Sequence, residues 1–391
     1  MENNNHNKTA DILSVGNILI GAIKAAVTGC EYTFPENTDF KKLLLLSEKH
    51  RVTSIISQQV AFCEFAPDDI KKQFKILLFK SAARYEAQEK ERQELSRLFC
   101  ENEIKHCFLK GSKVAAYYDD PSIRFMLDMD LLAESEKFSL AEKILVERGY
   151  EINTFGDDKD TGYVKPPFLN VELHRELKYE YDKGYEYYKA AQSRMVSSDG
   201  YVLNMTNEDF YVYILSHTAH HFEVAGTGIK SIVDHYYLNK KLKPLCDTAL
   251  LAEGLETIGL KAFCDRMDFL CEYWFGSGES ADDIQDMADY IILSGVFGTE
   301  TNYYLSGIIR GEYSQKKSSY YFARLFPSYE TMSTRYKILK KAKFLLPLFW
   351  VIRIITAVLK PDKIKGETDV VNSVDSSRAE QQQRFMKKMG L

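Results

Sequence analysis

Two aspartates, Asp128 and Asp130, interrupt an apolar segment at residues 124–133. On a β-strand, the side chains of residues i and i+2 point to the same face, so a strand here presents both carboxylates together. The opposite face of that strand carries Leu127, Met129 and Leu131. Neighbouring carboxylates resist joint ionisation unless a cation lies between them, and oxygen ligands suit Mg²⁺ or Mn²⁺. The pair therefore predicts a divalent-metal site; the alternative is two solvent-facing aspartates on an edge strand.

A glycine-containing turn precedes this segment. Lys110-Gly111-Ser112 joins a strand expected over 105–109 to a helix expected over 112–118. Glycine lets the backbone approach a ligand closely, and the free N–H groups at the start of a helix can bind an anion. A phosphate at this turn would face a metal held by the aspartates, so the two features together indicate a nucleoside triphosphate site.

Three motifs follow one another in this region. They are Lys110-Gly111, then Tyr118-Asp119-Asp120-Pro121-Ser122-Ile123-Arg124, then Asp128-Met129-Asp130-Leu131-Leu132. Their order and spacing resemble the nucleotidyltransferase superfamily, and most closely an uncharacterised bacterial group with Lys-Gly, Tyr-x-Asp-Pro-x-x-Arg and Asp-x-Asp-Leu-Leu. The resemblance covers about residues 85–240. It implies an α+β fold with a polymerase-β-like core, in which a mixed sheet is flanked by N- and C-terminal helical regions.

The resemblance also implies roles for individual residues. Asp128, Asp130 and Glu172 would be the catalytic carboxylates and the metal ligands, although the superfamily often has Asp where this chain has Glu172. The expected nucleotide-binding residues are Lys110, Gly111, Ser112 and Arg124. Lys110 and Arg124 would contact the β- and γ-phosphates of the nucleotide. The alternative for Lys110 is that it is a surface residue without a role in binding.

Four further residues are expected to support the catalytic ones: His174, His217, His220 and Asp234. His174 shares a strand face with Glu172 in a strand expected over 168–174. The resemblance implies that the other three belong to a helical layer that closes over the active site.

The spacing of the histidines at 217, 220 and 221 is also compatible with two simpler roles. Histidines spaced in this way on a helix can bind zinc, but Thr218 stands where a zinc protease motif needs glutamate. Packing between helices, with hydrogen bonds to neighbouring groups, is the plainer alternative.

The apolar periodicity, together with what the resemblance implies for the core, divides the chain into five segments. They are a disordered segment 1–9, an N-terminal helical region 10–102, a nucleotidyltransferase core 103–205, a C-terminal helical domain 206–360 and a polar tail 361–391. A single long helix is predicted from Pro67 to about Asn102, since proline is favoured at a helix start.

Residues 336–360 combine a basic start with the apolar run 344–352. The run is shorter than the ~20 residues needed to span a bilayer. It forms either a helix buried on the helical domain or a helix at a membrane surface with basic anchors. Pro347 and Arg353 interrupt a lipid-facing stripe, so we expect burial, with Trp350 inside.

Composition limits the setting in which the protein works. The net charge of −5 gives no overall electrostatic footprint for nucleic acid, so a nucleic-acid partner is not expected. Seven scattered cysteines without a Cys-x-x-Cys pair indicate reduced thiols and a cytoplasmic location. The N-terminus lacks the basic segment of a signal peptide.

These observations predict a Mg²⁺-dependent nucleotidyltransferase. It would move a nucleoside monophosphate from an NTP, expected to be ATP, to a hydroxyl of a small molecule or protein. The alternatives are a toxin-like nucleotidyltransferase acting on tRNA or protein, and a non-catalytic nucleotide-binding protein of the same fold. The acidic balance disfavours tRNA, and the three carboxylates disfavour a protein without turnover.

Overall fold

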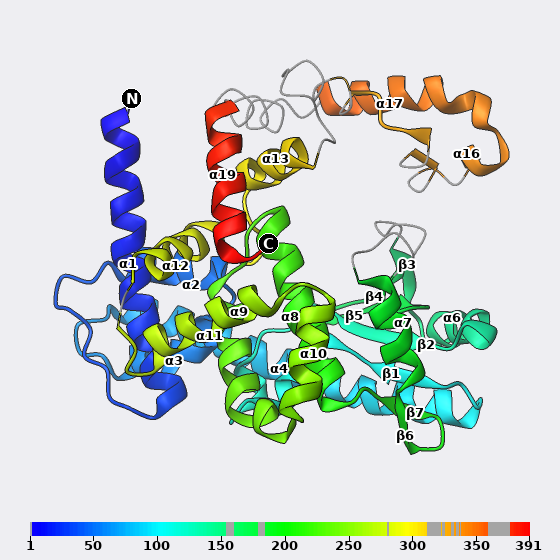
Figure 1. Ribbon diagram of the computed structural model, residues 1–391, viewed down its shortest axis with the longest axis horizontal. Coiled ribbons are helices and arrows are strands. Elements are labelled where there is room, and N and C mark those ends of the chain that lie inside the picture. Colours follow the sequence, from blue (N-terminus) through cyan, green and yellow to red (C-terminus); the bar gives the residue numbers. More distant parts are fainter. Residues whose placement is uncertain are drawn as a thin grey trace.

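The computed structural model describes residues 2–153, 160–178, 184–279, 281–310, 322, 325–329, 332–333, 336, 338–358 and 376–391. A seven-stranded mixed sheet lies beside helices from both ends of the chain, which makes the fold α+β (Figure 1). The strands are β1 His106–Phe108, β2 Met129–Ala133, β3 Glu151–Asn153, β4 Asp160–Lys165, β5 Leu169–His174, β6 Val196–Asp199 and β7 Val202–Asn204.

The strands are arranged in the order β3-β4-β5-β2-β1-β7-β6. Strand β2 is antiparallel to β1 on one side and parallel to β5 on the other, so the strand that follows Asp128 is central. This strand is shorter than predicted and begins only at Met129. Residues 124–128 instead connect the strand to a short 3₁₀-helix, η2 (Pro121–Ile123), which Asp120 caps by accepting a hydrogen bond from the Ser122 amide at 2.9 Å.

The two faces of the sheet have different environments. Met129, Leu131 and Ala133 of β2 are buried in a core formed with α4 (Asp68–Glu101) and α6 (Phe138–Glu147). Asp130 and Leu132 alternate with them and point to the other face. On that face lie the short helix α5 (Lys110–Val114), α8 (Asn207–Val224) and α9 (Ile229–Tyr237). One face is therefore purely structural, and the other is free to carry a site.

The N-terminal helices are α1 (Glu2–Thr28), α2 (Phe40–Lys49), α3 (Thr53–Phe62) and α4. Helix α4 confirms the long helix predicted from the sequence. Helix α1 stands upright beside the others, and the predicted disorder of 1–9 is wrong because α1 already begins at Glu2 (Figure 1). Packing of Leu19, Ala22 and Ile23 in the core fixes this helix, and the polar residues before them extend it.

Within α1, the segment Lys8–Thr28 is long and apolar enough to cross a membrane, judged by length and composition alone. Its buried side joins the core, where α1 contacts α2, α3, α11 (Lys261–Phe275) and α12 (Asp282–Ser294). The other helices of the C-terminal half include α7 Tyr185–Ser193, α10 Thr248–Thr257 and α13 Glu300–Ile309. Short 3₁₀ or π segments are η1 Ala115–Tyr117, η3 Ser135–Lys137, η4 Leu238–Leu242 and η5 Lys243–Leu245.

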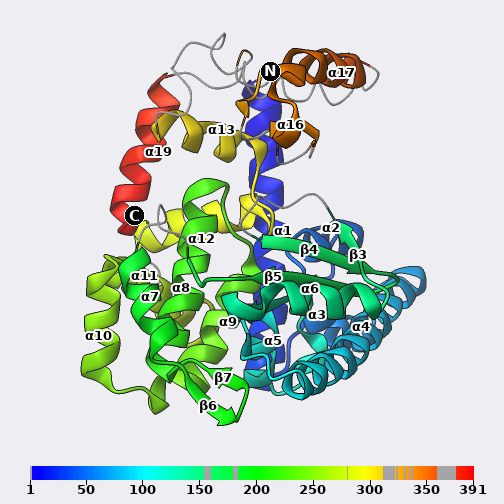
Figure 2. The same ribbon diagram turned by 90° about the vertical axis from the view of Figure 1, so that its right-hand side faces the viewer.

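The predicted polar tail contains a packed helix. Residues Ser376–Met389 form α19, which lies against α13 and α11 (Figure 2), whereas 361–375 lie outside the described residues. Met386 and Met389 are buried, and the Phe385 ring stacks on Phe222 with centroids 6.0 Å apart. A few apolar residues on one side of a polar sequence therefore suffice to dock this segment, which corrects the prediction of a loose tail.

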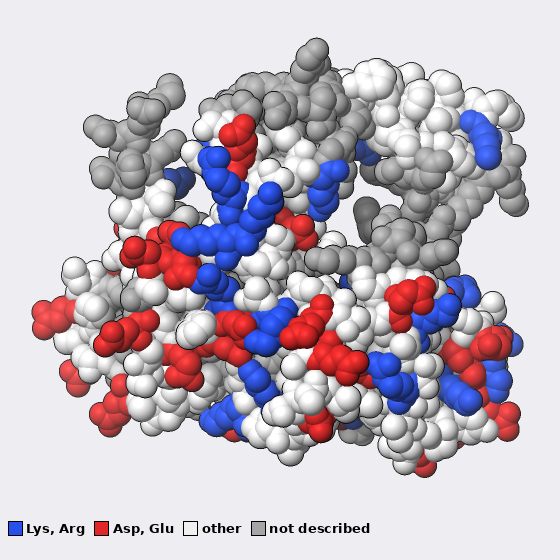
Figure 3. Space-filling view, in the orientation of Figure 1, with Lys and Arg blue, Asp and Glu red and all other residues white. Residues whose placement is uncertain are grey.

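The predicted burial of 336–360 is wrong. This segment forms α16 (Ile338–Lys341), η6 (Lys343–Leu345) and α17 (Leu346–Val358), which lie away from the sheet and the main helical body (Figure 1). Trp350 is only half-buried and donates a hydrogen bond from Nε1 to the Pro327 carbonyl at 3.0 Å. The large apolar side chains that are exposed among the described residues of this segment are Ile338, Phe344, Leu348, Val351, Ile352 and Ile355. The surface over α17 is almost without charge in Figure 3.

Candidate active site

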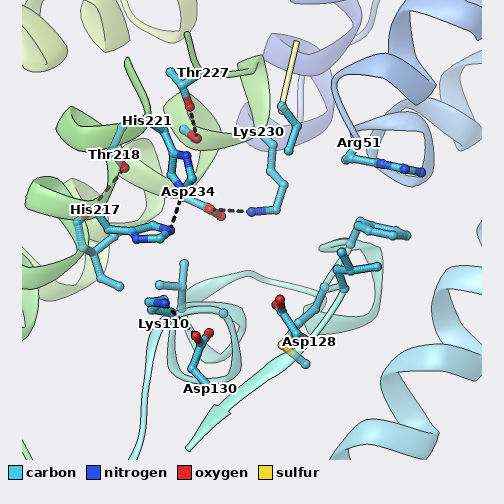
Figure 4. Close-up of a pocket in the computed structure, with 18 of the residues that line it drawn as sticks. Arg51, Lys110, Asp128, Asp130, His217, Thr218, His221, Thr227, Lys230 and Asp234 are labelled. Carbon is cyan, nitrogen blue, oxygen red and sulfur yellow. Dashed lines mark hydrogen bonds and ion pairs between the residues drawn. The ribbon is translucent and has the colours of Figure 1, made fainter. Parts of the chain in front are cut away.

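A cavity of about 490 Å³ opens on the site-bearing face of the sheet (Figure 4). Its walls come from the turn after α2, from α5, β2, β5, α8 and α9, and from residues 296–297. The charged and imidazole side chains that line it are Arg51, Lys110, Arg124, Asp128, Asp130, Glu172, His217, His220, His221, Lys230 and Asp234. Segments predicted as N-terminal helices, sheet core and C-terminal helices thus meet at one site.

Asp130 and Glu172 are directly paired neighbours on the parallel strands β2 and β5. Both side chains point into the cavity, so strand register brings together two carboxylates that are far apart in the sequence. His174 shares their face, with its Nε2 3.1 Å from Asp130 Oδ1 and 3.7 Å from Glu172 Oε2. The predicted support of the carboxylates by His174 is therefore a direct contact.

Lys110 neutralises this pair of carboxylates. Its Nζ donates a hydrogen bond to Asp130 Oδ1 at 2.6 Å and lies 3.9 Å from Glu172 Oε2. The side chain is 18% exposed, so Lys110 is not a surface residue. Burial alone would lower the pKa of Lys110, but Asp130 and Glu172 raise it above its ordinary value. Lys110 has a φ of 40°, a left-handed conformation that costs a non-glycine residue roughly 1–2 kcal/mol.

The three carboxylates differ in proton affinity. Burial would raise the pKa of Asp130, but Lys110 and His174 hold it well below its usual range. Burial and the neighbouring Asp130 raise the pKa of Asp128. Burial raises the pKa of Glu172 to about 7, with Lys110 opposing and Asp130 adding to the shift. Asp130 is thus firmly ionised. Asp128 and Glu172, in contrast, have too little positive charge beside them to offset the effect of burial.

Asp130, Glu172 and His174 form a set suited to a divalent metal. One ligand atom from each lies within 4.8 Å of the others. Two carboxylates and an imidazole suit Mn²⁺, and the oxygen ligands suit Mg²⁺. The predicted set contained Asp128 in place of His174. Asp128 immediately precedes β2 and also lines the cavity, but its carboxylate lies separate from that of Asp130 (Figure 4).

The glycine turn has a structural role that the sequence does not reveal. The Gly111 carbonyl accepts a hydrogen bond from Arg124 Nη1 at 3.2 Å, and a Cβ at Gly111 would lie 3.1 Å from that nitrogen and from Met126 Sδ. Gly111 therefore permits close approach of Arg124 from within the protein. The Ser112 hydroxyl contacts Met126 Sδ at 3.7 Å, and the cavity lining includes Gly111 but not Ser112.

Arg124 is buried in an ion pair with Asp234 of α9. Its Nε donates to Asp234 Oδ1 at 2.7 Å and its Nη2 donates to Oδ2 at 2.9 Å. The Tyr118 hydroxyl donates to Oδ1 at 2.6 Å, and Lys230 Nζ donates to Oδ2 at 3.0 Å. The tyrosine and arginine of the Tyr-x-Asp-Pro-x-x-Arg motif thus converge on one carboxylate. This arrangement fixes α9 to the core and engages the guanidinium that was predicted to bind phosphate.

The histidines of α8 line the cavity opposite Asp128. His217 Nε2 and His221 Nε2 lie 3.1 Å apart, and Figure 4 shows both rings directed toward the space above Lys110. Burial, with Lys110 and His221 adding, lowers the pKa of His217 well below its ordinary value. His220 also lines the cavity. The placement agrees with the predicted layer over the site, and within the described part of the chain these histidines form no three-residue metal-ligand group.

Sequence reasoning missed two cations of the cavity, Arg51 and Lys230. Lys230 had a local signal, because it precedes Asp234 by four residues on a helix and such residues are neighbours. Arg51 had no such signal. It lies in the turn between α2 and α3, and only the tertiary structure brings that turn to the sheet.

Carboxylates on adjacent strands, facing a cavity with several cationic side chains, define a site suited to metal-assisted chemistry on phosphates. The family model for uncharacterised nucleotidyltransferases matches residues 36–276, more than half of the chain. The chain belongs to this nucleotidyltransferase family. The family supports nucleotidyl transfer as the general activity and an NTP as a substrate. No curated protein and no solved structure matches the chain.

Proposed function

We propose that the protein is a divalent-metal-dependent nucleotidyltransferase that transfers a nucleoside monophosphate from an NTP to an acceptor hydroxyl. The observation that carries this proposal is the register of β2 and β5, which places Asp130 and Glu172 side by side in the cavity. The acceptor would be a small molecule or a protein. We infer a polymerase-β-like core from the same feature, since the carboxylates lie on adjacent central strands with the glycine turn beside them.

Asp130, Glu172 and His174 would hold the metal, with Asp128 facing the same cavity. The chemistry supplied by a divalent ion at these residues is neutralisation of phosphate charge and polarisation of the α-phosphate. In the reaction, a bond forms between the acceptor oxygen and the α-phosphorus, the bond to the bridging oxygen breaks, and pyrophosphate leaves. Glu172 is the candidate base for the hydroxyl proton, because its carboxylate lines the cavity beside Asp130, within reach of an acceptor bound there.

A labelled-nucleotide assay tests this proposal. The full-length protein is incubated with a cell lysate, Mg²⁺ and each NTP carrying ³²P at either the α- or the γ-position. We expect transfer of the α-label and none of the γ-label. Asp130→Asn should reduce transfer about tenfold to a hundredfold or more. Losses of that size follow even from mutating residues that only hydrogen-bond to a metal ligand. The control is Asp119→Asn, which changes an exposed aspartate of the neighbouring motif.

Transfer of the γ-label instead would identify a phosphotransferase, and wild-type transfer by Asp130→Asn would exclude the assigned site. A second function is favoured by one observation, the Lys110 ammonium already bound to Asp130. That arrangement suits a nucleotide-binding protein without turnover, in which lysine takes the place of a metal. Calorimetric titration with the four NTPs, with and without Mg²⁺, distinguishes the two, because only the enzyme requires Mg²⁺ for tight NTP binding.

A further inference from the structure

Two guanidinium groups, those of Arg51 and Arg84, flank Phe125 at the edge of the active-site cavity. Arg51 Cζ lies 4.8 Å from the Phe125 ring centroid, and Arg84 Cζ lies 5.1 Å from the same point. Arg51 also lies 5.5 Å from the ring of Phe297, and Arg84 lies 5.1 Å from that of Phe168. Aromatic faces attract and orient cations but offer no hydrogen-bond acceptor in the ring plane. The rings therefore hold both groups while leaving N–H donors unused.

Within the described part of the chain, neither guanidinium forms an ion pair with a carboxylate or a hydrogen bond. The other cations of the cavity are engaged, Lys110 by Asp130 and both Arg124 and Lys230 by Asp234. The Nε of Arg51 is buried without a hydrogen-bond partner among the described residues. Such groups are rare and destabilising, so an unused buried donor beside a second cation points to a missing anion.

A second cavity of about 260 Å³ adjoins the first, and Arg51, Phe125 and Leu127 line both. Arg84 and Lys80 also line this smaller cavity, and among the described residues of its lining Glu48 is the one that is acidic. Three cations against one carboxylate favour an anionic ligand. The smaller cavity thus extends the active site on the side that carries Arg51 and Arg84.

The end of α2 fixes the backbone at Arg51. Its φ is 56° because it occupies the left-handed position after the helix, where the Arg51 amide donates to the Glu48 carbonyl at 3.1 Å and the Val52 amide donates to the Ser47 carbonyl at 3.0 Å. Figure 4 shows Arg51 beyond Lys230, on the side of the cavity away from His217. A triphosphate or a phosphorylated acceptor that reaches past Asp128 would meet this guanidinium.

We infer that Arg51 and Arg84 form a phosphate-binding subsite at the side of the active-site cavity. Arginine binds phosphate through two parallel N–H donors, and Arg51 and Arg84 contact the same ring and line the same small cavity, where both can bind one phosphate-bearing ligand. The phosphate belongs either to the terminal part of the NTP or to the acceptor. The role in transfer rests on the proposed function, whereas phosphate binding itself is measurable without turnover.

Calorimetric titration of the full-length protein with inorganic phosphate and with tripolyphosphate tests the subsite. We expect Arg51→Gln and Arg84→Gln each to weaken binding about tenfold or more, the usual effect of losing a charge-assisted hydrogen bond. The matched control is Arg97→Gln on the same helix as Arg84, since Arg97 is exposed and pairs with Glu94 and Glu101. The two test residues lie on separate elements, so misfolding of one variant leaves the other informative.

Equal tripolyphosphate affinity in wild type and both variants, or no binding by wild type, overturns the inference. Titrations with NMP and NTP then identify the source of the phosphate. If the subsite binds the NTP terminus, the variants lose NTP affinity and keep NMP affinity. If it binds the acceptor, NTP affinity is unchanged and inorganic phosphate still binds the NTP-loaded protein. Failure of the proposed function shows separately, as undiminished transfer by Asp130→Asn.

Discussion

Arg124 and Asp234 form a two-point ion pair across 110 residues of sequence, with both side chains buried. Arg124 is the last residue of the Tyr-x-Asp-Pro-x-x-Arg motif, which precedes β2. Asp234 belongs to α9 of the C-terminal helical part. Because Lys230 and Tyr118 bind the same carboxylate, this contact determines how the helical layer sits over the carboxylates of the sheet. The geometry of the cavity therefore depends on a residue pair that is not itself placed on the reacting atoms.

The first prediction concerns this pair. Asp234→Ala leaves Arg124 buried without its counter-ion, so we expect a loss of about 3–5 kcal/mol in the free energy of unfolding. Tyr118→Phe removes one hydrogen bond to the same carboxylate and should cost less, roughly 1.5–3 kcal/mol. Urea denaturation followed by circular dichroism measures both. Equal stability of Asp234→Ala and wild type would contradict a structural role for the pair.

The second prediction concerns Lys110, whose ammonium competes with any metal for Asp130 and Glu172. Lys110→Met should lower the melting temperature of the metal-free protein, because it leaves like charges unneutralised. It should also raise the affinity for Mn²⁺, measured by calorimetry, and Mn²⁺ should restore the melting temperature. As a control, Lys241→Met removes a cation whose partner, Asp119, lies at the surface. Unchanged or weaker Mn²⁺ binding by Lys110→Met would mean that the lysine and the metal do not share these ligands.

The third prediction concerns pH and His50. This buried histidine accepts a hydrogen bond from the Ile229 amide at Nδ1 and contacts the Ile292 carbonyl through Nε2. Burial lowers its pKa from 6.5 to about 4. The unfolded chain therefore binds a proton below pH 6.5 that the folded chain refuses until about pH 4. Stability that is fully present above pH 6.5 should fall by roughly 3 kcal/mol as the pH drops to 4.

His50→Gln tests this assignment, because glutamine keeps one donor and one acceptor but does not titrate. The variant should lose less stability than wild type between pH 7.5 and 5, measured as melting temperature. The same pH sensitivity in wild type and His50→Gln would assign the effect to other groups.

The fourth prediction concerns α17. Leu348, Val351, Ile352 and Ile355 are exposed and recur at the spacing of one helical face. Lys343 lies just before this helix, and the charge over the helix is low (Figure 3). We expect the full-length protein to sediment with anionic liposomes in a salt-sensitive way. Leu348→Asp with Ile355→Asp should abolish this without changing the melting temperature, and sedimentation by the double variant would exclude α17 as the contact.

Local periodicity was enough to predict several parts of this protein from its sequence. The alternation of Met129, Asp130 and Leu131 predicts which side chains share a strand face, and the structure keeps that alternation. The long apolar period after Pro67 predicts α4. The motif spacing predicts the nucleotidyltransferase superfamily, which the family match over 36–276 supports. Each of these features depends on residues that are close together in the sequence. The geometry of a strand or helix therefore determines on which face each side chain lies.

Which charges face one another, in contrast, depends on contacts between distant segments. Strand register paired Asp130 with Glu172, α9 supplied the counter-ion of Arg124, and the turn after α2 brought Arg51 to the cavity. Such contacts also set burial, since α19 is docked by a few apolar side chains while the more apolar α17 stays exposed. The hydrophobicity and charge of a segment limit which kinds of surface it can contact. Which surface it does contact depends on the packing of all the segments together, and a local sequence pattern does not contain that information.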